Sequence, residues 1–329
     1  MKPISYFRPA ALVGAFVLLL QCAVQAQSVA ADYPNRPVRV VVPFTPGGAG
    51  DLVARTISNQ LALRLKRPFI VDNRAGGGGV IGADAVVRSA PDGYTILFHS
   101  GAITIDPSFR KSLPYDVRRD LVPITMAVTG PFAVLTSTAT PAKTLPELLA
   151  LARARPGTLN FGSTGLGTSI HLGSELLKST AKVDIVHVPF KGEVPALMAL
   201  SSNEIQILVN TILSARPMID SGKVRLLAVT GRNRSAVLPD APTVAESGVP
   251  GYESGVWLGF FAPAGTPRDI VNKLYTEIRA VLQQPEVKAQ LLEKGLEVAD
   301  YPPEEFAKWI DQEITRWGAV IRAAGIEPQ

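Results

Sequence analysis

Residues 38–51 read VRVVVPFTPGGAGD, and this stretch indicates the fold class of the 329-residue chain. The β-branched run 38–42 stops at Pro43 and predicts a buried strand. A turn-rich loop with three glycines follows. From Asp51 onward, apolar residues recur every fourth position on what we expect to be an amphipathic helix, at Val53, Ile57, Leu61 and Leu65. The stretch therefore predicts a strand, a glycine-rich loop and a helix in succession.

The same order of elements recurs along the chain. In the first half, a strand at 69–71, four glycines at 76–79, a helix at 80–88 and a strand at 94–98 are expected. In the second half, further strands are expected at 159–161, 185–188, 205–210 and 225–230. A second glycine-rich loop, at 162–169, is expected before a helix. Repeated strand, loop and helix predict an α/β fold with mainly parallel sheets. The C-terminal part is expected to be helical.

The N-terminal residues 1–26 are expected to be a signal peptide. Lys2 and Arg8 precede a ten-residue apolar stretch, Ala11 to Leu20, which is too short to span a bilayer. Small residues then offer cleavage after Ala26, with a second option after Ala30. Cys22, the only cysteine, lies inside this segment, and its lipidation is the alternative interpretation. We therefore expect export to the periplasm.

Composition excludes several classes of protein. Removal of residues 1–26 leaves 31 Lys and Arg (33 minus Lys2 and Arg8) against 28 Asp and Glu, a net charge of +3. That charge, without a run of basic residues, does not indicate nucleic-acid binding. The expected mature chain has no cysteine, which excludes disulfides and thiol chemistry. The three histidines lack metal-ligand spacing, so neither a metal nor a cofactor is expected.

Two glycine-rich loops, 45–51 and 162–169, are the candidate binding elements. Glycine lets the backbone approach a ligand closely, and the free amides of a helix N-terminus attract anions. The two loops could hold a carboxylate from opposite sides. The alternative is that they need glycine for turn geometry alone. The spacing Gly77-x-Gly79-x-x-Gly82 matches a dinucleotide fingerprint, but the expected acidic residue about 20 positions later is missing, because Phe98-His99-Ser100 ends the next strand.

Catalytic signals are weak. No Gly-x-Ser-x-Gly elbow is present, and Ser163, Thr164 and Thr168 suit hydrogen bonding to a carboxylate better than nucleophilic attack. His99 is expected at a strand end facing the cleft, whereas His187 is expected in the core. We therefore expect a binding protein and no enzyme. The alternatives are an exported hydrolase of a carboxylate ester or amide, with His99 or His171 as its base, and a ligand-sensing adaptor for a signalling partner.

Many short motifs follow one another in order from Tyr33 to near the C-terminus. They include VPFTPGG (42–48), NRAGGGG (73–79), APDGYT (90–95), GSTG (162–165), HVPFKG (187–192), LPDAPTVAE (238–246) and APAGTP (262–267). Together these motifs resemble one family, the Bug-type extracytoplasmic receptors of tripartite tricarboxylate transporters. The resemblance implies a type II periplasmic binding protein with a ligand cleft between two α/β lobes. Lobe 1 would comprise 33–130 and 232–329, and lobe 2 would comprise 131–231, with hinges near Thr129 and Thr230.

The resemblance also implies a small carboxylate ligand, held by the loop at 44–51 and by the 163–168 loop of the other lobe. The ligand-binding residues that we expect are Phe44, Thr45, Gly47, Gly48, Asp51, Gly78, Ser100, Ser163, Thr164, Gly167, Thr168, His171 and Asn210. The implied partners are permease subunits of a tripartite transporter, and the chain itself is expected to be a monomer. Where many relatives carry Asp-Asn, this chain has Asn210-Thr211. If Asn210 faces the cleft, acids without an amino group are expected to bind better.

Overall fold

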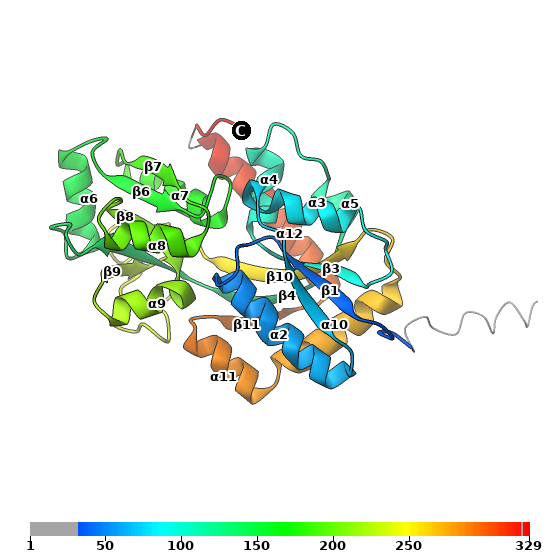
Figure 1. Cartoon of the computed structure of the whole chain (residues 1–329). Helices are drawn as coiled ribbons and strands as arrows, with labels where there is room; N and C mark the ends of the chain where they lie inside the picture. The colour runs from blue at the N-terminus through cyan, green and yellow to red at the C-terminus, as the bar shows by residue number, and fades with distance from the viewer. Residues whose placement is uncertain (1–31, 324) are drawn as a thin grey trace, which may run out of the picture.

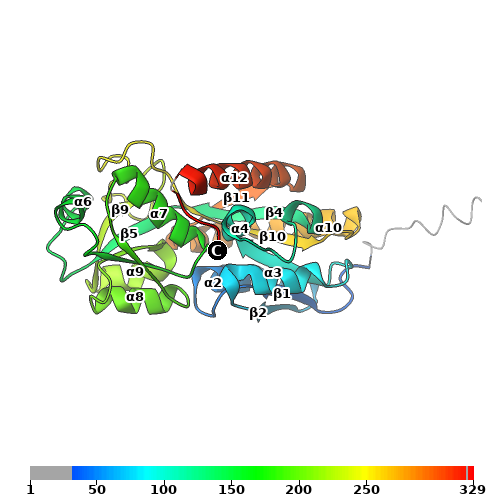
Figure 2. The ribbon, with the colours of Figure 1, turned by 90° about the horizontal axis from the view of Figure 1, so that it is seen from above.

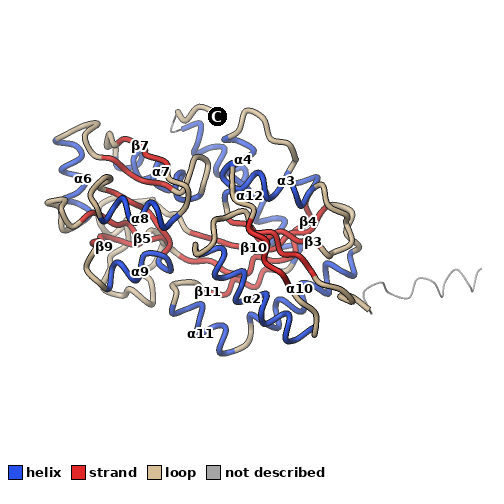
Figure 3. The backbone as a smooth tube through the Cα atoms, viewed as in Figure 1, coloured by secondary structure: helices blue, strands red, loops and turns tan. Residues whose placement is uncertain are grey.

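The computed structural model describes residues 32–323 and 325–329, so the expected signal peptide lies outside the described residues. It contains two mixed β-sheets, each covered by helices, which appear as separate groups of strands in Figures 1 and 3. This is an α/β architecture with two lobes, as the sequence predicts. Within residues 32–323 and 325–329, no helix combines the length and apolar character needed to cross a membrane.

The first sheet has six strands in the order β11-β4-β10-β3-β1-β2. Their bounds are β1 Val38–Val42, β2 Phe69–Asn73, β3 Thr95–Ser100, β4 Leu121–Gly130, β10 Val256–Pro263 and β11 Glu297–Tyr301. The second sheet has five strands in the order β7-β6-β8-β5-β9. Their bounds are β5 Phe132–Ser137, β6 Asn160–Ser163, β7 Val186–Pro189, β8 Ile207–Thr211 and β9 Val224–Val229.

The sheets are less parallel than the sequence predicts. β1 pairs in parallel with β2 and β3, and β6 does so with β7 and β8. β10 runs antiparallel to β3 and β4, and β5 runs antiparallel to β8 and β9. The reason is topological, because β5 and β10 are the strands with which the chain enters the second sheet and returns to the first.

Helices bury both faces of the first sheet. α2 Ala49–Leu65 and α10 Arg268–Leu282 share one apolar cluster with Val40, while α3 Val80–Val87 and α12 Pro303–Ala323 share another with Val41. Successive residues of β1 thus face opposite cores, as expected for a strand buried on both faces. α12 lies along the β11–β4 side of this lobe (Figure 2).

The remaining helices connect or flank these strands. In the first lobe they are η1 Gly77–Gly79, α4 Ala102–Phe109, α5 Val117–Asp120 and α11 Pro285–Glu293. In the second lobe they are α6 Leu145–Ala154, α7 Ser169–Ala181, α8 Glu193–Ser201 and α9 Ile212–Asp220. The helix predicted from Val53, Ile57 and Leu61 is α2, and all three side chains are buried. It starts two residues before Asp51, so the preceding loop is correspondingly shorter.

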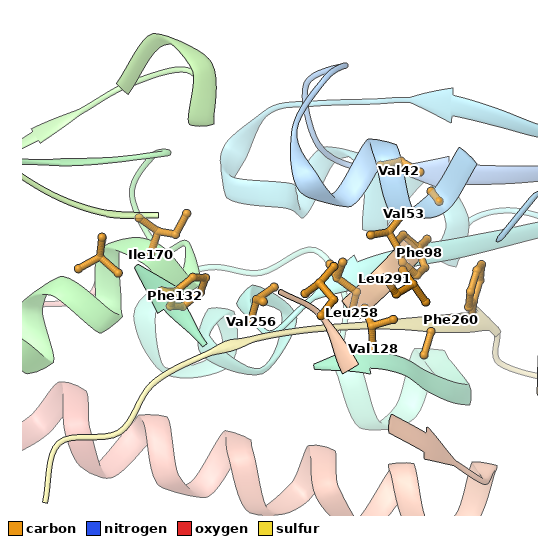
Figure 4. Packing of buried hydrophobic residues seen from close by; sticks show 14 of the residues in the cluster. Val42, Val53, Phe98, Val128, Phe132, Ile170, Val256, Leu258, Phe260 and Leu291 are labelled. Carbon is orange, nitrogen blue, oxygen red and sulfur yellow. The ribbon is translucent and has the colours of Figure 1, made fainter. Parts of the chain in front are cut away.

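One apolar cluster continues from lobe to lobe. Val53 and Phe98 belong to the first lobe, Phe132 and Ile170 to the second, and Val256 lies between them in the same cluster (Figure 4). The lobes therefore share a core at the crossing, although each has its own sheet.

The crossing segments are hydrogen-bonded to one another at both expected hinge residues. Oγ1 of Thr129 donates to the carbonyl of Val256 at 3.2 Å. Oγ1 of Thr230 donates to the carbonyl of Ser254 at 2.7 Å and accepts from the amide of Phe132 at 2.8 Å. A rotation of one lobe about this point must therefore move the two segments together.

The segment 232–255 is expected in lobe 1 from the sequence, but its hydrogen bonds join it to the second sheet and α7. The amide of Val229 on β9 donates to Pro242, and the amide of Val244 donates back to Val229, both at 2.9 Å. The hydroxyl of Tyr252 donates to the carbonyl of Gly173 on α7 at 3.0 Å. These bonds attach the segment to the second sheet and its helices, so we propose a second lobe of about 131–255. Sequence patterns did not reveal this because the segment contains neither a regular helix nor a strand.

Candidate ligand-binding site

A cavity of about 530 Å³ lies between loops of the two lobes. It is lined from the first lobe by Pro43, Phe44, Thr45, Gly48, Ala75, Gly76, Gly77, Gly78, Gly79 and Arg110. It is lined from the second lobe by Thr164, Gly165, Leu166, Thr168, Pro189, Phe190, Lys191, Gly192 and Glu193. These loops follow β1, β2, β6 and β7, and ligands of α/β sheets bind at such carboxyl ends of strands. The volume is typical of sites for small molecules.

The lobes meet on two sides of this cavity. On one side, a Cβ on Gly192 would lie 2.5 Å from Oγ1 of Thr45. On the other, a Cβ on Gly78 would lie 2.8 Å from the carbonyl oxygen of Leu166. Only glycine permits either approach, because real Cβ atoms essentially never come within 3.0 Å of such a neighbour. The glycines thus allow the lobes to close together around the cavity.

Asp51 holds the first loop in shape. Its Oδ2 accepts from the amide of Gly47 at 3.0 Å and from Nε of Arg55 at 3.1 Å, and its Oδ1 accepts from Nδ2 of Asn73 at 2.9 Å. Burial raises the pKa of Asp51, but hydrogen bonds from Arg55, Gly47 and Asn73 outweigh burial and lower it. The buried carboxylate therefore orients the loop at 44–48 and does not itself line the cavity.

Thr168 organises the second loop. Its hydroxyl donates to the carbonyl of Gly165 at 2.9 Å and accepts from the amide of His171 at 3.3 Å, which caps α7. Oγ1 of Thr164 donates to Oγ1 of Thr168 at 3.1 Å. These bonds fix the turn that brings Thr164, Gly165 and Thr168 to the cavity wall.

The residues expected to bind the ligand fall into three groups. Six of them line the cavity: Phe44, Thr45, Gly48, Gly78, Thr164 and Thr168. Ser100 lines a smaller recess of about 50 Å³, which Phe44 and Glu193 also border. The remaining residues belong to the elements around the cavity without lining it: Gly47, Asp51, Ser163, Gly167, His171 and Asn210.

His99 does not face the cavity as expected. It is fully buried, and a Cβ on Gly79 would lie 2.6 Å from its Nε2, so the backbone of Gly79 covers the ring. Its Nδ1 accepts from the amide of Ser100 at 2.8 Å. Burial lowers the pKa of His99 to about 4, against hydrogen bonds that raise it. The ring is thus a neutral packing group beneath the glycine loop.

His171 and His187 form a stacked pair beside the second loop. Their ring centroids are 4.2 Å apart, and burial lowers the pKa of His171 to about 3 and that of His187 to about 4. Nε2 of His187 lies 2.6 Å from Oγ of Ser163, a contact that sequence reasoning did not anticipate. Ser163 is fully buried and neither member of this serine–histidine pair lines the cavity. A nucleophile and its base must reach the reacting atoms of a substrate, and the lining of the cavity includes neither Ser163 nor His187.

Arg110 is a cavity residue that sequence reasoning missed. It follows α4, and its side chain hydrogen-bonds to the carbonyls of Gly77 in the first lobe and Leu166 in the second. Its Nε donates to Oδ1 of the buried Asp106 at 3.0 Å. Burial raises the pKa of Asp106 to about 7, against the opposing effect of Arg110. Arg110 and Lys191 are the cations lining the cavity.

The C-terminal residue flanks Arg110. The amide of Gln329 donates to the carbonyl of Phe109 at 2.8 Å, and its carbonyl accepts from the amide of Lys111 at 2.9 Å. These two backbone bonds hold the chain on either side of Arg110. No sequence motif surrounds Arg110, and its contacts lie 33 residues before it and 56 residues after it.

Glu193 is the second residue that sequence reasoning missed, and it changes the argument based on Asn210. Asn210 is fully buried and lines neither cavity, so the condition behind the expected preference against amino groups is not met. Glu193 brings a carboxylate to the cavity instead. Its Oε2 accepts from the hydroxyl of Thr211 at 2.6 Å. Among the described residues, no group of three or more His, Cys, Asp or Glu could hold a metal ion.

The model of the tripartite tricarboxylate transporter family receptor matches residues 53–326. The chain belongs to this family. Among the relatives of this receptor is a protein encoded in the tcbD–tcbE intergenic region of Pseudomonas sp. strain P51, with 40% identity over 94% of this chain and 92% of the relative. BugT of Bordetella pertussis is 36% identical over 96% of this chain and 97% of BugT.

Solved structures of similar proteins agree with the receptor family. An R. palustris protein with adipate has a TM-score of 0.88 and 35% identity, covering 91% of this chain and 100% of that protein. The periplasmic binding protein BugD has a TM-score of 0.86 and 33% identity, covering 90% and 100%. MatC from Rhodopseudomonas palustris with bound malate has a TM-score of 0.82 and 34% identity, covering 88% and 100%.

Proposed function

We propose that this receptor encloses a small carboxylate between its lobes and delivers it to the membrane subunits of a tripartite permease. The observation that carries the proposal is Arg110, a cation that lines the cavity between the lobes and contacts backbone carbonyls of both lobes. Guanidinium groups suit carboxylate recognition. Two relatives of similar fold are solved with the carboxylates adipate and malate.

The apolar part of the cavity supports a ligand with a carbon skeleton. Phe44, Leu166 and Phe190 line the cavity together with Arg110 and Lys191. Small-molecule sites combine such apolar walls with a few polar groups that fix orientation. Closure about the crossing near Thr129 and Thr230 would bury the acid and present the closed form to the permease.

The cellular setting completes the proposal. We expect export to the periplasm, removal of about residues 1–26, a monomer in solution and no catalytic turnover. The first two expectations are checked by N-terminal sequencing of the protein recovered from a periplasmic fraction. A retained N-terminus, or recovery only from the cytoplasm, would contradict them. Light scattering coupled to size exclusion tests the monomer.

The ligand proposal is tested by thermal shift on protein purified from the periplasm, with mono-, di- and tricarboxylates and amino acids. A ligand at about a hundred times its Kd adds roughly 2.7 kcal/mol to the free energy of unfolding. That increment raises the Tm by several degrees. A shift by one class of acid, with the acid intact after long incubation, supports a receptor. Absence of a shift with every acid would overturn the carboxylate proposal.

The same incubation addresses the hydrolase alternative. The 2.6 Å contact between Ser163 and His187 is the observation that favours testing it. Release of product from a carboxylate ester or amide by the wild type, lost in Ser163→Ala, would support the hydrolase. Unchanged esters and amides in both proteins support the receptor.

A further inference from the structure

Glu193 crosses between the lobes at the edge of the cavity. It is the first residue of α8 in the second lobe, whereas its Oε1 lies 3.6 Å from the position that a Cβ on Gly48 of the first lobe would occupy. Ala49 at the start of α2 borders the smaller recess together with Glu193. Oε2 is held in place by the hydroxyl of Thr211. The carboxylate therefore lies between Gly48, the N-cap residue of α2 in the first lobe, and Thr211, the N-cap residue of α9 in the second.

This placement puts a carboxylate beside the N-terminus of α2. The N-cap residue of α2 is Gly48, and no side chain caps the helix locally. Free amides and the helix dipole attract negative charge to such a position. The side chain of Glu193 provides that negative charge from within the protein, so a ligand carboxylate is not required there.

Glu193 also separates two spaces. It lines the main cavity together with Gly48, and it lines the smaller recess together with Ala49 and Thr211. A ligand that extends toward α2 must therefore place its end group beside this carboxylate. Two like charges held at close range in a partly buried site repel strongly.

The cavity carries the opposite charge on its other side. Arg110 contacts the loop at 77–78 and the carbonyl of Leu166, whereas Glu193 lies beside Gly48 and Ala49. One side of the cavity thus favours a carboxylate, and the other favours a neutral or positive hydrogen-bond donor. Lys191 adds a second cation to the wall.

We infer that Glu193 is a specificity-determining residue: it disfavours a second carboxylate on the ligand and accepts a hydroxyl or ammonium group at that end. The inference rests on the proposed function, because it concerns the acid bound in the same cavity. It makes the receptor selective for acids with one carboxylate and a donor group over diacids of the same length.

The test compares acids of one skeleton that differ only in the far group. The probes are hexanedioate, 6-hydroxyhexanoate and 6-aminohexanoate, together with the four-carbon series succinate, 4-hydroxybutanoate and 4-aminobutanoate. Isothermal titration gives the Kd of each acid for the wild type, Glu193→Gln and the control Glu204→Gln. Glu204 is an exposed acid of the same lobe and does not line the cavity. Because burial raises the pKa of Glu193, titrations at about pH 8 favour its ionised form.

The expected result is a change in the ratio of two affinities, that of the hydroxy or amino acid and that of the diacid of the same skeleton. In the wild type and Glu204→Gln, the hydroxy or amino acid binds at least tenfold more tightly than the diacid of the same skeleton. In Glu193→Gln, that ratio falls at least tenfold, mainly because the diacid binds more tightly. A gain in affinity also shows that the variant is folded.

Two other results have different meanings. Binding of these acids with the same ratio in wild type and Glu193→Gln overturns the inference and leaves the proposed function standing. Absence of binding by any probe to all three proteins, with cooperative thermal unfolding retained, overturns the inference together with the carboxylate site on which it rests.

Discussion

Thr45 and Gly192 meet across the cavity so closely that a Cβ on Gly192 would lie 2.5 Å from Oγ1 of Thr45. The contact joins the loop after β1 to the loop after β7, one from each lobe. Gly192 also has a φ of 116°, which side chains with a Cβ rarely adopt. The closed arrangement therefore requires glycine at this position.

Gly192→Ala is expected to weaken ligand binding by at least tenfold. The added methyl group opposes the approach of the two lobes, so the binding-competent closed form becomes less populated and the apparent Kd rises. Titration calorimetry measures the Kd, and small-angle scattering measures the compaction on ligand addition. Gly222→Ala is the matched control, because Gly222 has a φ of 67° but nothing within 4 Å of its Cβ position. Equal affinities of the two variants would contradict the role of this contact.

Arg110→Gln is expected to lower the affinity for carboxylates by about ten- to a hundredfold, because a charged hydrogen bond to the ligand is lost. The single variant also leaves Asp106 buried without its cation, which lowers stability. The double variant Asp106→Asn/Arg110→Gln removes both charges and is expected to lose affinity with a smaller loss of stability.

Arg88→Gln is the control for the Arg110 variants, since Arg88 forms the same i,i+4 pair with Asp84 on the surface. Calorimetry measures affinity, and urea unfolding measures stability. Wild-type affinity in the double variant would show that Arg110 does not contact the ligand.

Asp51→Asn is expected to lower the free energy of unfolding by about 1–3 kcal/mol at neutral pH. The NH2 group of asparagine would take the place of a carboxylate oxygen and would face one of the donors that now bond to Asp51. The folded pKa of Asp51 is lowered, so its contribution is present above the unfolded pKa and is lost as the pH falls through the folded value. The difference between wild type and variant should therefore shrink below about pH 4.

Urea unfolding at several pH values measures the effect of Asp51→Asn. Asp311→Asn is the comparison, because Asp311 pairs with Arg118 on the surface, where ion pairs contribute little. A difference between wild type and Asp51→Asn that stays constant from neutral to acid pH would contradict the assigned role of the carboxylate.

The buried histidines predict a loss of stability in mild acid. Their folded pKa values are about 4 for His99, 3 for His171 and 4 for His187, all below the unfolded value of about 6.5. The unfolded chain therefore binds protons first as the pH falls below about 6.5. Each histidine then lowers the free energy of unfolding by up to about 1.4 kcal/mol per pH unit. The stabilisation is fully present above that pH and is lost toward pH 4.

His171→Gln isolates one of these contributions. The slope of unfolding free energy against pH, measured between about pH 6.5 and 5, should be lower than that of the wild type by the contribution of one histidine, up to about 1.4 kcal/mol per pH unit. An unchanged slope would show that His171 is protonated in the folded protein over this range. His171 lies outside the cavity lining, so ligand binding at neutral pH serves as a check of the fold.

Local patterns predicted much of the fold. The four-residue spacing of Val53, Ile57 and Leu61 reports which side of α2 is buried, and the β-branched residues of β1 report burial on both faces. The pairing of β10 between β3 and β4 was not predicted, since it joins segments more than 120 residues apart. The attachment that we propose for 232–255 was missed because this segment contains neither a regular helix nor a strand.

The residues of the candidate site also divide into those that local sequence patterns predicted and those that they did not. Thr45, Gly48, Thr164 and Thr168 line the cavity, and each lies in a loop whose glycines and position before a helix are visible in the sequence. Arg110 has no such local signal, and the signal before Glu193, a glycine between a strand and a helix, does not show that its side chain reaches the other lobe. Arg110 reaches the cavity because α4 ends beside two loops from distant parts of the chain, and Glu193 reaches it from the opposite lobe. Tertiary packing alone brings these charges to the wall.

The backbone bonds of Gln329 to Phe109 and Lys111 have a practical consequence for handling the protein. A purification tag or an immobilisation linker fused after Gln329 would start beside Arg110, at the wall of the cavity. A cationic or bulky extension could alter the apparent affinity by displacing these two bonds. Binding assays are therefore best made on protein whose affinity handle is removed by a protease, or carried on an exposed surface loop such as the turn at Gly222.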